Sequence, residues 1–192
     1  MSTRDVARAL GVSPTTVQMM VEKGVLKAWR TSGGHRRISE ASMHALLRQR
    51  PSSRGEALTL ALQVLVAEDD EQILKLYEAK FKAWKLPVDL TMVSDGLEAL
   101  IALGRNPPDV LIADLALPRV DGFEMLRMLR KDRAFSDMDI IVVSALSRDS
   151  VSKRGGVPAG ITVLSKPIPY EQLLGFLQAC IARRKIHPAL AQ

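Results

Sequence analysis

Short apolar runs alternate with amphipathic segments over residues 63–184. The apolar runs have the length of buried strands, and the segments between them repeat apolar residues at helical spacing. The predicted strands cover residues 64–67, 88–93, 110–113, 140–143 and 161–164. The predicted helices cover residues 70–84, 95–105, 122–131, 147–154 and 170–184. Five strand–helix pairs with apolar strands predict a parallel sheet that is covered by helices on both faces.

The alternation also predicts the order of the strands. We expect an α/β fold with a flavodoxin-like, doubly wound, five-stranded parallel sheet of order 2-1-3-4-5. In that order the first, third, fourth and fifth strands are consecutive neighbours. Their carboxyl ends then face one crevice, which is where open α/β sheets bind ligands.

The start of the chain follows a different pattern. Thr3 can cap a first helix, and Ser13 with Pro14 opens a second helix that ends at Gly24. Two short helices so close in sequence predict a helix-turn-helix. The other predicted elements here are two hairpin strands, at residues 25–30 and 37–39, and a third helix at residues 39–50.

The chain therefore divides into a small winged helix-turn-helix domain and a larger α/β domain. The predicted segments are a winged helix-turn-helix domain at residues 1–50, a linker at 51–62, the α/β domain at 63–184 and a tail at 185–192. The linker begins with the polar sequence PSSRG, which suits a connection between domains.

Charge is concentrated in the small domain. Residues 1–55 contain ten Lys and Arg against three Asp and Glu, a net charge of +7. The rest of the chain carries 17 basic and 18 acidic residues, a net charge of −1. This asymmetry predicts a polyanionic partner, such as DNA, for the small domain alone.

Candidate DNA contacts lie on the second helix and on the hairpin. We expect the outward face of the second helix to show Thr15, Thr16, Gln18, Met19, Glu22 and Lys23. Lysines and arginines neutralise phosphates without reading sequence, whereas Gln and Thr side chains can contact base edges. The candidate contacts are Thr15, Thr16, Gln18, Lys23, Arg30, His35, Arg36 and Arg37. The alternative is that these residues form a solvated face.

Three stretches of residues 2–49 resemble the winged helix-turn-helix domains of the MerR and excisionase-like families. They are VARALGVSPTTV at residues 6–17, AWR at 28–30 and GGHRRI at 33–38. The resemblance implies a DNA-binding headpiece, in agreement with its charge.

Polar residues end four of the predicted strands in the α/β domain. Glu68 and Asp69 end the first strand, Asp114 the third, Ser144 the fourth and Lys166 the fifth. Because these strands are neighbours in the expected sheet, the five side chains face one crevice. The chemistry that suits this set is phosphoryl transfer to Asp114. The two neighbouring carboxylates would repel the incoming phosphoryl group, so a hard cation has to lie among the three carboxylates.

A role follows for each of these groups. Asp69, Asp114 and the carbonyl of Ala116 would hold Mg²⁺, and Glu68 would act through water. Asp114 would attack the phosphoryl group as the nucleophile. Lys166 would supply a positive charge and Ser144 a hydrogen bond. The alternative to a magnesium site is a structural calcium site, but calcium requires more oxygen ligands than this crevice offers.

Residues 63–183 resemble the receiver domains of two-component systems. The matching motifs are VAEDD at residues 66–70, DLALPRVDG at 114–122, VSA at 143–145 and SKP at 165–167. Their separations agree as well, with 45 residues from Asp69 to Asp114, 30 from there to Ser144 and 22 more to Lys166. The resemblance implies that Asp114 is the phospho-acceptor, that Ser144 is the switch hydroxyl and that a cis bond precedes Pro167.

The leading hypothesis is a response regulator. A histidine kinase or phosphotransfer protein would phosphorylate Asp114, and phosphorylation would control DNA binding and transcription. A homodimer through the α/β domain is expected, at least in the phosphorylated state. Catalysis would extend only to the protein's own phosphorylation and dephosphorylation.

The alternative is an atypical receiver that serves as a phosphorylation-independent interaction or dimerisation module. Val163 stands where receivers usually carry Tyr or Phe, and GGVPAG at residues 155–160 ends the fourth helix early. An aspartyl-phosphate phosphatase is disfavoured, because nothing besides the acidic pair offers a general acid or base near Asp114.

The composition of the chain indicates the cellular compartment in which the protein works. A single cysteine, Cys180, excludes an internal disulfide framework and suits a reducing compartment. No apolar run reaches transmembrane length, and the N-terminus lacks the pattern of a signal peptide. We therefore expect a cytoplasmic protein that does not use a membrane.

Overall fold

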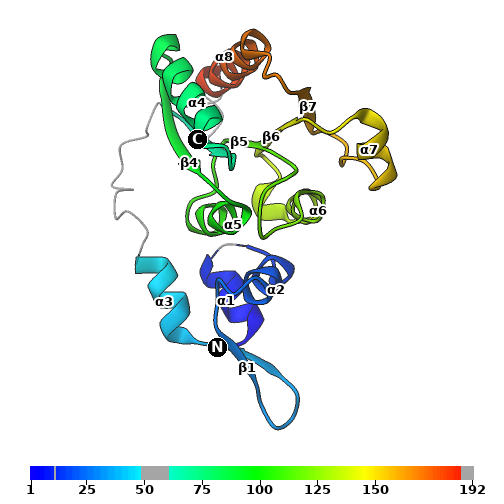
Figure 1. The fold of residues 1–192 in the computed structure, drawn as a ribbon. Coiled ribbons are helices and arrows are strands. Elements are labelled where there is room, and N and C mark those ends of the chain that lie inside the picture. The colour runs from blue at the N-terminus through cyan, green and yellow to red at the C-terminus, as the bar shows by residue number, and fades with distance from the viewer. Residues whose placement is uncertain (11, 49–60, 187–192) are drawn as a thin grey trace.

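The computed structural model describes residues 1–10, 12–48 and 61–186, and it contains a winged headpiece and a five-stranded α/β domain (Figure 1). All strands of the larger sheet are parallel, in the order β4-β3-β5-β6-β7. The strands are β3 (Leu62–Ala67), β4 (Val88–Val93), β5 (Val110–Ala113), β6 (Asp139–Ser144) and β7 (Thr162–Ser165). This order is the predicted 2-1-3-4-5 arrangement, which is confirmed.

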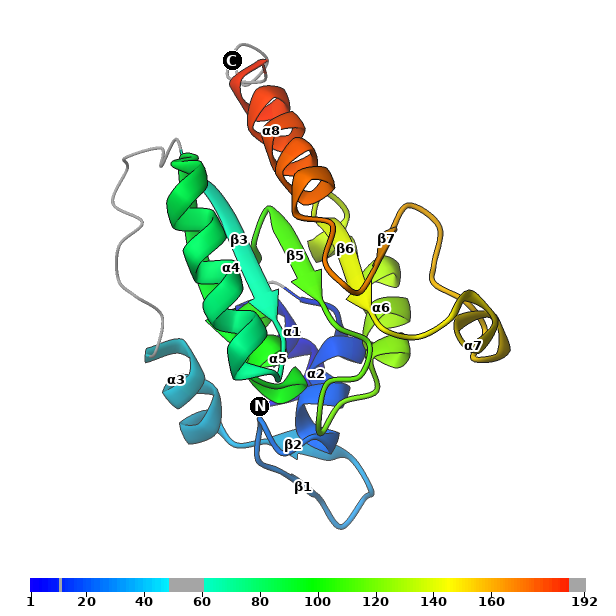
Figure 2. The ribbon, with the colours of Figure 1, turned by 45° about the horizontal axis from the view of Figure 1, so that its top comes forward.

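Helices cover both faces of the sheet (Figure 2). One face packs against α4 (Glu71–Trp84) and α8 (Tyr170–Ile186), which contribute Tyr77, Leu173 and Leu177 to a buried cluster. The other face packs against α5 (Gly96–Arg105) and α6 (Gly122–Lys131). The two apolar layers leave the carboxyl ends of the central strands as the polar edge of the domain.

Side-chain caps fix where the helices begin. Asp70 accepts hydrogen bonds from two backbone N–H groups of α4, and Asp95 does the same at the start of α5. Asp121 caps α6 through the Glu124 N–H. Such caps satisfy N–H groups that have no partner within the helix. They hold the first turns of these helices beside the polar edge of the sheet.

The fourth helix of the α/β domain is short. α7 (Arg148–Lys153) ends before Gly155 and Gly156, both of which have positive φ. The N–H of Gly156 donates to the carbonyl oxygen of Val151. This hydrogen bond ends the helix with a left-handed backbone conformation, which glycine adopts without strain. Val163, on the edge strand β7 that follows along the chain, is 47% exposed. The early end predicted for this helix is confirmed.

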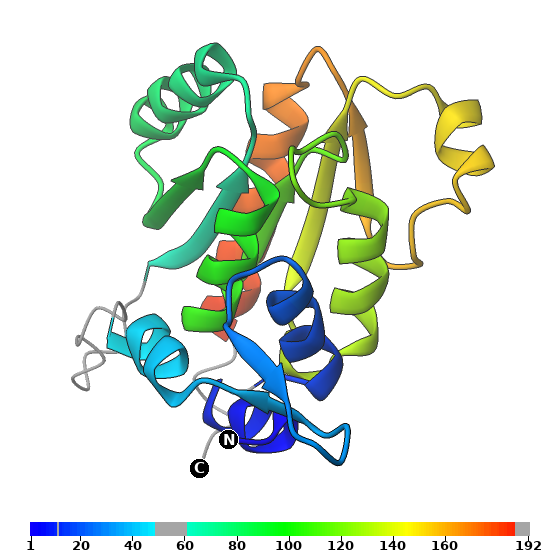
Figure 3. The same ribbon diagram turned by 60° about the horizontal axis from the view of Figure 1, so that its bottom comes forward.

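The headpiece has the predicted winged helix-turn-helix arrangement (Figure 3). Its elements are α1 (Thr3–Leu10), α2 (Pro14–Glu22), β1 (Ala28–Arg30), β2 (Arg36–Ile38) and α3 (Glu40–Arg48). Ser13 caps α2 as expected. The cap expected at Thr3 lies one residue earlier. The Ser2 oxygen Oγ accepts the Asp5 backbone N–H, and the Asp5 carboxylate accepts the hydroxyl and the backbone N–H of Ser2.

Several predicted element boundaries differ from the structure by one to three residues, and two of the differences change the division of the chain into segments. Leu62, placed in the linker, pairs with Val88 as the first residue of β3. Helix α8 continues to Ile186 and so enters the predicted tail. Most of the predicted linker, together with residues 187–192, lies outside the described residues. Within the described ranges, no helix combines the length and the apolar character that crossing a membrane requires.

The headpiece packs on the face of the α/β domain that carries α5 and α6 (Figure 3). Buried residues of α1 and α2 form one continuous apolar cluster with those of α5 and α6. Figure 1 shows the β1–β2 hairpin projecting away from this contact. One side of helix α2 is therefore covered, whereas the hairpin is accessible.

One glycine sets the close approach of α6 to the strand end. A Cβ at Gly122 would lie 2.7 Å from the Leu115 carbonyl oxygen and 2.8 Å from the Leu115 Cα. Because these are backbone atoms, they can move aside only if the loop moves. We expect Gly122→Ala to lower the free energy of unfolding by about 1–3 kcal/mol in urea titrations.

The matched control is Gly175→Ala. Gly175 lies in α8 and has no atom within 4 Å of the added Cβ. There the change should raise stability by about 0.5–1 kcal/mol through helix propensity. Equal effects at the two positions would contradict the packing argument.

Candidate functional site

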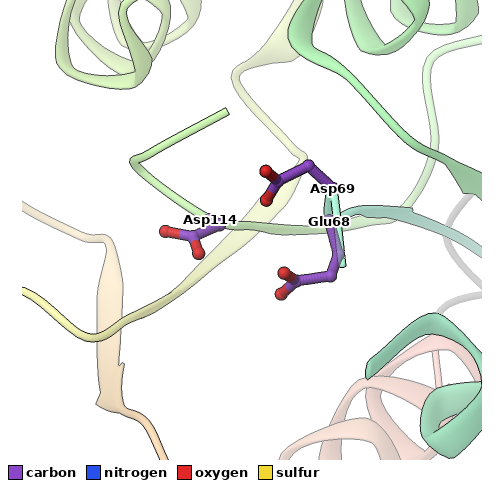
Figure 4. Close-up of side chains that lie close together, drawn as sticks. All are labelled: Glu68, Asp69 and Asp114. Atoms are coloured by element: carbon purple, nitrogen blue, oxygen red, sulfur yellow. The ribbon is translucent and has the colours of Figure 1, made fainter. Parts of the chain in front are cut away.

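Three carboxylates gather at the polar edge of the sheet (Figure 4). Glu68 and Asp69 follow the last residue of β3, and Asp114 follows the last residue of the neighbouring strand β5. One ligand oxygen from each lies within 4.8 Å of the others. Glu68 and Asp114 are buried, whereas Asp69 is exposed. The predicted juxtaposition of these residues is present.

Lys166 joins the two buried carboxylates. Its Nζ donates to Glu68 Oε1 at 2.9 Å and to Asp114 Oδ2 at 2.7 Å. The Lys166 backbone N–H donates to the Ser144 carbonyl, so the lysine is anchored at the end of β6. The peptide bond from Lys166 to Pro167 is cis, as the resemblance to receivers implied.

Burial and ion pairing act in opposite directions on these groups. Burial raises the pKa of Glu68 above its usual value, although its hydrogen bond to Lys166 works the other way. For Lys166 burial lowers the pKa, but the hydrogen bonds to Asp114 and Glu68 outweigh it and the net pKa is raised. The ammonium ion therefore keeps its charge between two carboxylates.

The loop after Asp114 is fixed at several points. Asp114 Oδ1 accepts the Ala116 N–H at 3.0 Å, and Arg119, with a positive φ, forms an ion pair with Asp95. The Gly96 N–H donates to the carbonyl of Pro118. This loop thus connects the acidic cluster to the start of α5 and leads into α6.

Ser144 lies at the end of β6 and is buried, with its hydroxyl oxygen accepting the N–H of Leu146. Sequence reasoning placed it just after the strand, whereas it is the last residue of β6, and its role as the switch hydroxyl stays a prediction.

The cluster has the chemistry of a site for a hard cation. Carboxylate oxygens are the preferred ligands of Mg²⁺, and three of them converge here. Of the three carboxylates, that of Asp69 is the most exposed to solvent. The contribution of the Ala116 carbonyl stays a prediction.

The candidate DNA contacts of the hairpin are accessible. Arg30 and His35 are exposed, and Arg36 and Arg37 are partly exposed. Arg36 lies 3.8 Å from the Glu22 carboxylate of α2. Sequence reasoning assigned no role to Trp29, which is 55% exposed on β1 and pairs across the hairpin with Arg37. An exposed aromatic ring among arginines is the signal that could have singled it out.

The second helix is only partly accessible. Thr15 and Gln18 are exposed and Lys23 is partly exposed. The prediction that Thr16 and Met19 face outward is wrong for this structure. Thr16 is 1% exposed and donates its hydroxyl hydrogen to Asp132 of the α/β domain, and Met19 is 5% exposed within the apolar cluster that both domains share. The apolar residues Met19 and Met20 give α2 a second apolar side, which could have signalled this contact.

Asp132 is a functional candidate that the sequence analysis missed. It follows α6, and its Oδ2 accepts the Ser13 N–H at 2.7 Å and the Thr16 hydroxyl at 2.5 Å. Burial works against its ionisation, but hydrogen bonds from Thr16, Ala134 and Ser13 outweigh it and lower the pKa.

Fold and site together define a receiver-type signalling domain joined to a winged headpiece. The chain belongs to the response regulator receiver domain family, whose match covers residues 64–178. Residues 1–51 match a helix-turn-helix domain family. The helix-turn-helix unit precedes the receiver.

Curated relatives share the receiver part. Response regulator MprA of Mycobacterium ulcerans is 35% identical over 129 residues, which are 66% of this chain and 53% of the relative. MprA of Mycobacterium leprae is 36% identical over 126 residues, 65% of this chain and 53% of the relative. The chain thus spans about half the length of the curated relatives it matches.

Solved structures show the same fold. A Francisella response regulator receiver domain is 32% identical with a TM-score of 0.54, over 64% of this chain and 98% of that one. A sensor protein from Polaromonas is 31% identical with a TM-score of 0.55 and the same coverage. A receiver of a Pseudomonas aeruginosa sensor histidine kinase, 24% identical with a TM-score of 0.54 over 64% and 98% of the two chains, supports the fold alone.

Removing the lysine leaves two buried carboxylates without a positive partner. We expect Lys166→Ala to lower the free energy of unfolding by about 3 kcal/mol at pH 8, measured in urea. The loss should shrink as the pH falls towards 5, because the folded-state pKa of Glu68 is raised and its protonation removes the repulsion.

The exposed residue Lys75 of α4 provides the control, and Lys75→Ala should leave stability nearly unchanged at both pH values. A loss for Lys166→Ala that is the same at pH 5 and pH 8 would contradict the charge argument.

Proposed function

We propose that this response regulator accepts a phosphoryl group on Asp114 and that phosphorylation controls DNA binding by its headpiece. The observation that carries the proposal is the contact between Asp114 and Lys166, at 2.7 Å, within a cluster of three carboxylates. The donor would be a phosphohistidine of a histidine kinase or of a phosphotransfer protein.

The transfer can be written with the groups of this chain. A carboxylate oxygen of Asp114 attacks phosphorus, the bond from phosphorus to the imidazole nitrogen breaks, and the electron pair stays on the imidazole. Lys166 is already hydrogen-bonded to Asp114, and its positive charge would stabilise the phosphoryl oxygens. Ser144 offers a hydroxyl donor from the neighbouring strand end.

Mg²⁺ is the proposed cofactor. Asp69 and Asp114 would hold it with the Ala116 carbonyl and water, and Glu68 would act through water. Bound there, the ion would neutralise charge on the transferring oxygens. The P. aeruginosa receiver holds a magnesium ion in its active site cleft. In this chain the support is the convergence of three carboxylates.

DNA is the proposed partner of the headpiece. The β1–β2 hairpin presents Arg30, His35, Arg36 and Arg37, and the helix-turn-helix adds Thr15, Gln18 and Lys23. Arginine contacts to phosphates supply affinity that depends on salt, and helix side chains supply sequence preference. We further expect a homodimer after phosphorylation, since paired headpieces can bind paired half-sites.

A second candidate function is a receiver that recruits partners without phosphorylation. The observations that favour it are the exposed Val163 on β7 and the short helix α7. In that case the conformation of the receiver would not depend on Asp114, and affinity for DNA would be the same with and without a phosphoryl donor.

Phosphorylation is tested by intact mass after incubation with acetyl phosphate and Mg²⁺. The wild-type chain should gain one phosphoryl group, and Asp114→Asn should gain none. Asp69→Asn keeps the nucleophile but weakens the cation site, so its rate should fall and should recover in part at higher Mg²⁺. A folded wild-type chain that gains no mass would sink the phosphorylation proposal and favour the second candidate.

DNA binding is tested by the salt dependence of affinity. Arg30→Ala and Arg37→Ala should weaken binding to all sequences to a similar extent and should reduce the salt slope by about one each. Lys153→Ala removes the same charge from the exposed end of α7 and should change neither quantity. Equal effects of all three variants would point to net charge and not to a contact by the hairpin.

A further inference from the structure

The receiver carries a local concentration of positive charge at the end of α6. Residues 127–133, RMLRKDR, contain four basic residues and one acidic residue. The chain beyond residue 55 is otherwise close to neutral, with 17 basic and 18 acidic residues in all. The stretch covers the last turn of α6 and reaches the 3₁₀ turn that follows it, Arg133–Phe135.

The one acidic residue of this stretch connects it to the start of α2. Asp132 is buried and accepts hydrogen bonds from the backbone N–H of Ser13 and from the Thr16 hydroxyl. Its neighbours in the chain are Lys131 and Arg133, whose Cα atoms lie about 3.8 Å from that of Asp132. The end of α6, yellow-green in Figure 3, therefore places two basic residues next to the first turn of α2.

The four basic residues fall into two pairs. Arg130 donates to two backbone carbonyl groups and Arg127 to one, so both help to fix the loops around α6. Lys131 and Arg133 are exposed. Neither of them donates a side-chain hydrogen bond or forms an ion pair within residues 1–10, 12–48 and 61–186. Their charges are thus free to meet a partner outside the chain.

Helix stability accounts for only one of these two cations. Lys131 lies in the last turn of α6, where a positive charge interacts favourably with the helix dipole. Arg133 lies beyond the C-cap residue Asp132, in the 3₁₀ turn, and has no such role in α6. A ligand that takes both charges explains the pair better than the dipole does.

The exposed side of α2 indicates what that ligand is. Thr15 and Gln18 are exposed on the first turns of this helix, the part of a recognition helix that contacts base edges. The phosphates that border a groove lie beside the N-terminus of a helix inserted into it, and helix N-termini are among the groups that bind them. A duplex contacted by Thr15 and Gln18 would therefore bring its backbone to the end of α6.

We propose that Lys131 and Arg133 of the receiver bind backbone phosphates of the duplex that the headpiece contacts, so that the DNA-binding surface extends over both domains. The proposal rests on DNA binding as the proposed function of the headpiece, and it adds a contact made by the receiver. Charge complementarity favours duplex DNA as the partner, because the two cations continue the basic surface of a headpiece segment with a net charge of +7. Such contacts supply affinity and orientation, and they do not read sequence.

The test removes the two charges together in the full chain. The receiver pair is Lys131→Gln with Arg133→Gln, which deletes both cations and keeps side chains of similar shape. The control pair is Lys75→Gln with Lys82→Gln, which deletes the same charge from exposed residues of α4, on the opposite face of the sheet. Affinity for two duplexes of unrelated sequence is measured between about 50 and about 200 mM salt.

The receiver pair should reduce the salt slope by about two, one for each phosphate contact, and should weaken binding to both duplexes to the same extent. The control pair should keep the wild-type slope. Arg133→Lys alone keeps the charge and should also keep the slope, which separates a phosphate contact from a change in the fold. A wild-type slope for the receiver pair would overturn the proposal, and so would an equal loss for the receiver and control pairs.

The hairpin variant Arg37→Ala separates failure of this proposal from failure of the proposed function. If Arg37→Ala reduces the salt slope and the receiver pair does not, the headpiece binds DNA and the receiver makes no contact with it, so this proposal alone is wrong. If the folded wild-type chain binds neither duplex, the proposed function and the receiver contact fail together.

Discussion

Two carboxylates buried side by side cannot both stay ionised unless a cation balances them, and much of the receiver is arranged around that constraint. Lys166 supplies the balance from the end of β7, and the order of the parallel strands brings it within 3 Å of both Glu68 and Asp114. Asp69 remains exposed beside this pair. The site therefore combines a satisfied ion pair with one carboxylate that is open to a further cation.

A second buried carboxylate, at the opposite end of α6, is also stabilised by polar partners. There the negative charge of Asp132 is balanced by hydrogen-bond donors of α2 and not by a lysine. Both ends of one receiver helix are thus tied to polar contacts, one at the acidic cluster and one at the headpiece. An apolar cluster that runs from α1 and α2 into α5 and α6 stabilises the contact between the two domains.

Sequence reasoning predicted most of the receiver because its signals are local. Short apolar runs, capping residues such as Asp95 and Asp121, and polar strand ends each belong to one segment, and parallel pairing then brings the ends together. The polar residues of the site were all predicted at strand ends. Their geometry followed once the strand order was known.

The contact between the domains was not predicted, since it depends on surfaces that meet only in the folded chain. Thr16 looks like a solvent-facing helix residue, and Asp132 looks like an ordinary helix end. Leu62 belongs to a stretch, residues 56–62, that reads as an extension of the linker or as an irregular helical turn, yet it pairs with β4. Tertiary packing decided these positions and local pattern did not.

The headpiece occupies the α5–α6 face, and within the described ranges no further strand pairs with the β7 edge of the sheet. β7 is the last strand of the sheet, and Val163 on it is 47% exposed. A second molecule approaching this edge would meet neither α2 nor Asp132. A contact at this edge and the contact between the headpiece and the receiver therefore use separate surfaces of the same domain, so that a change at one surface need not disturb the other.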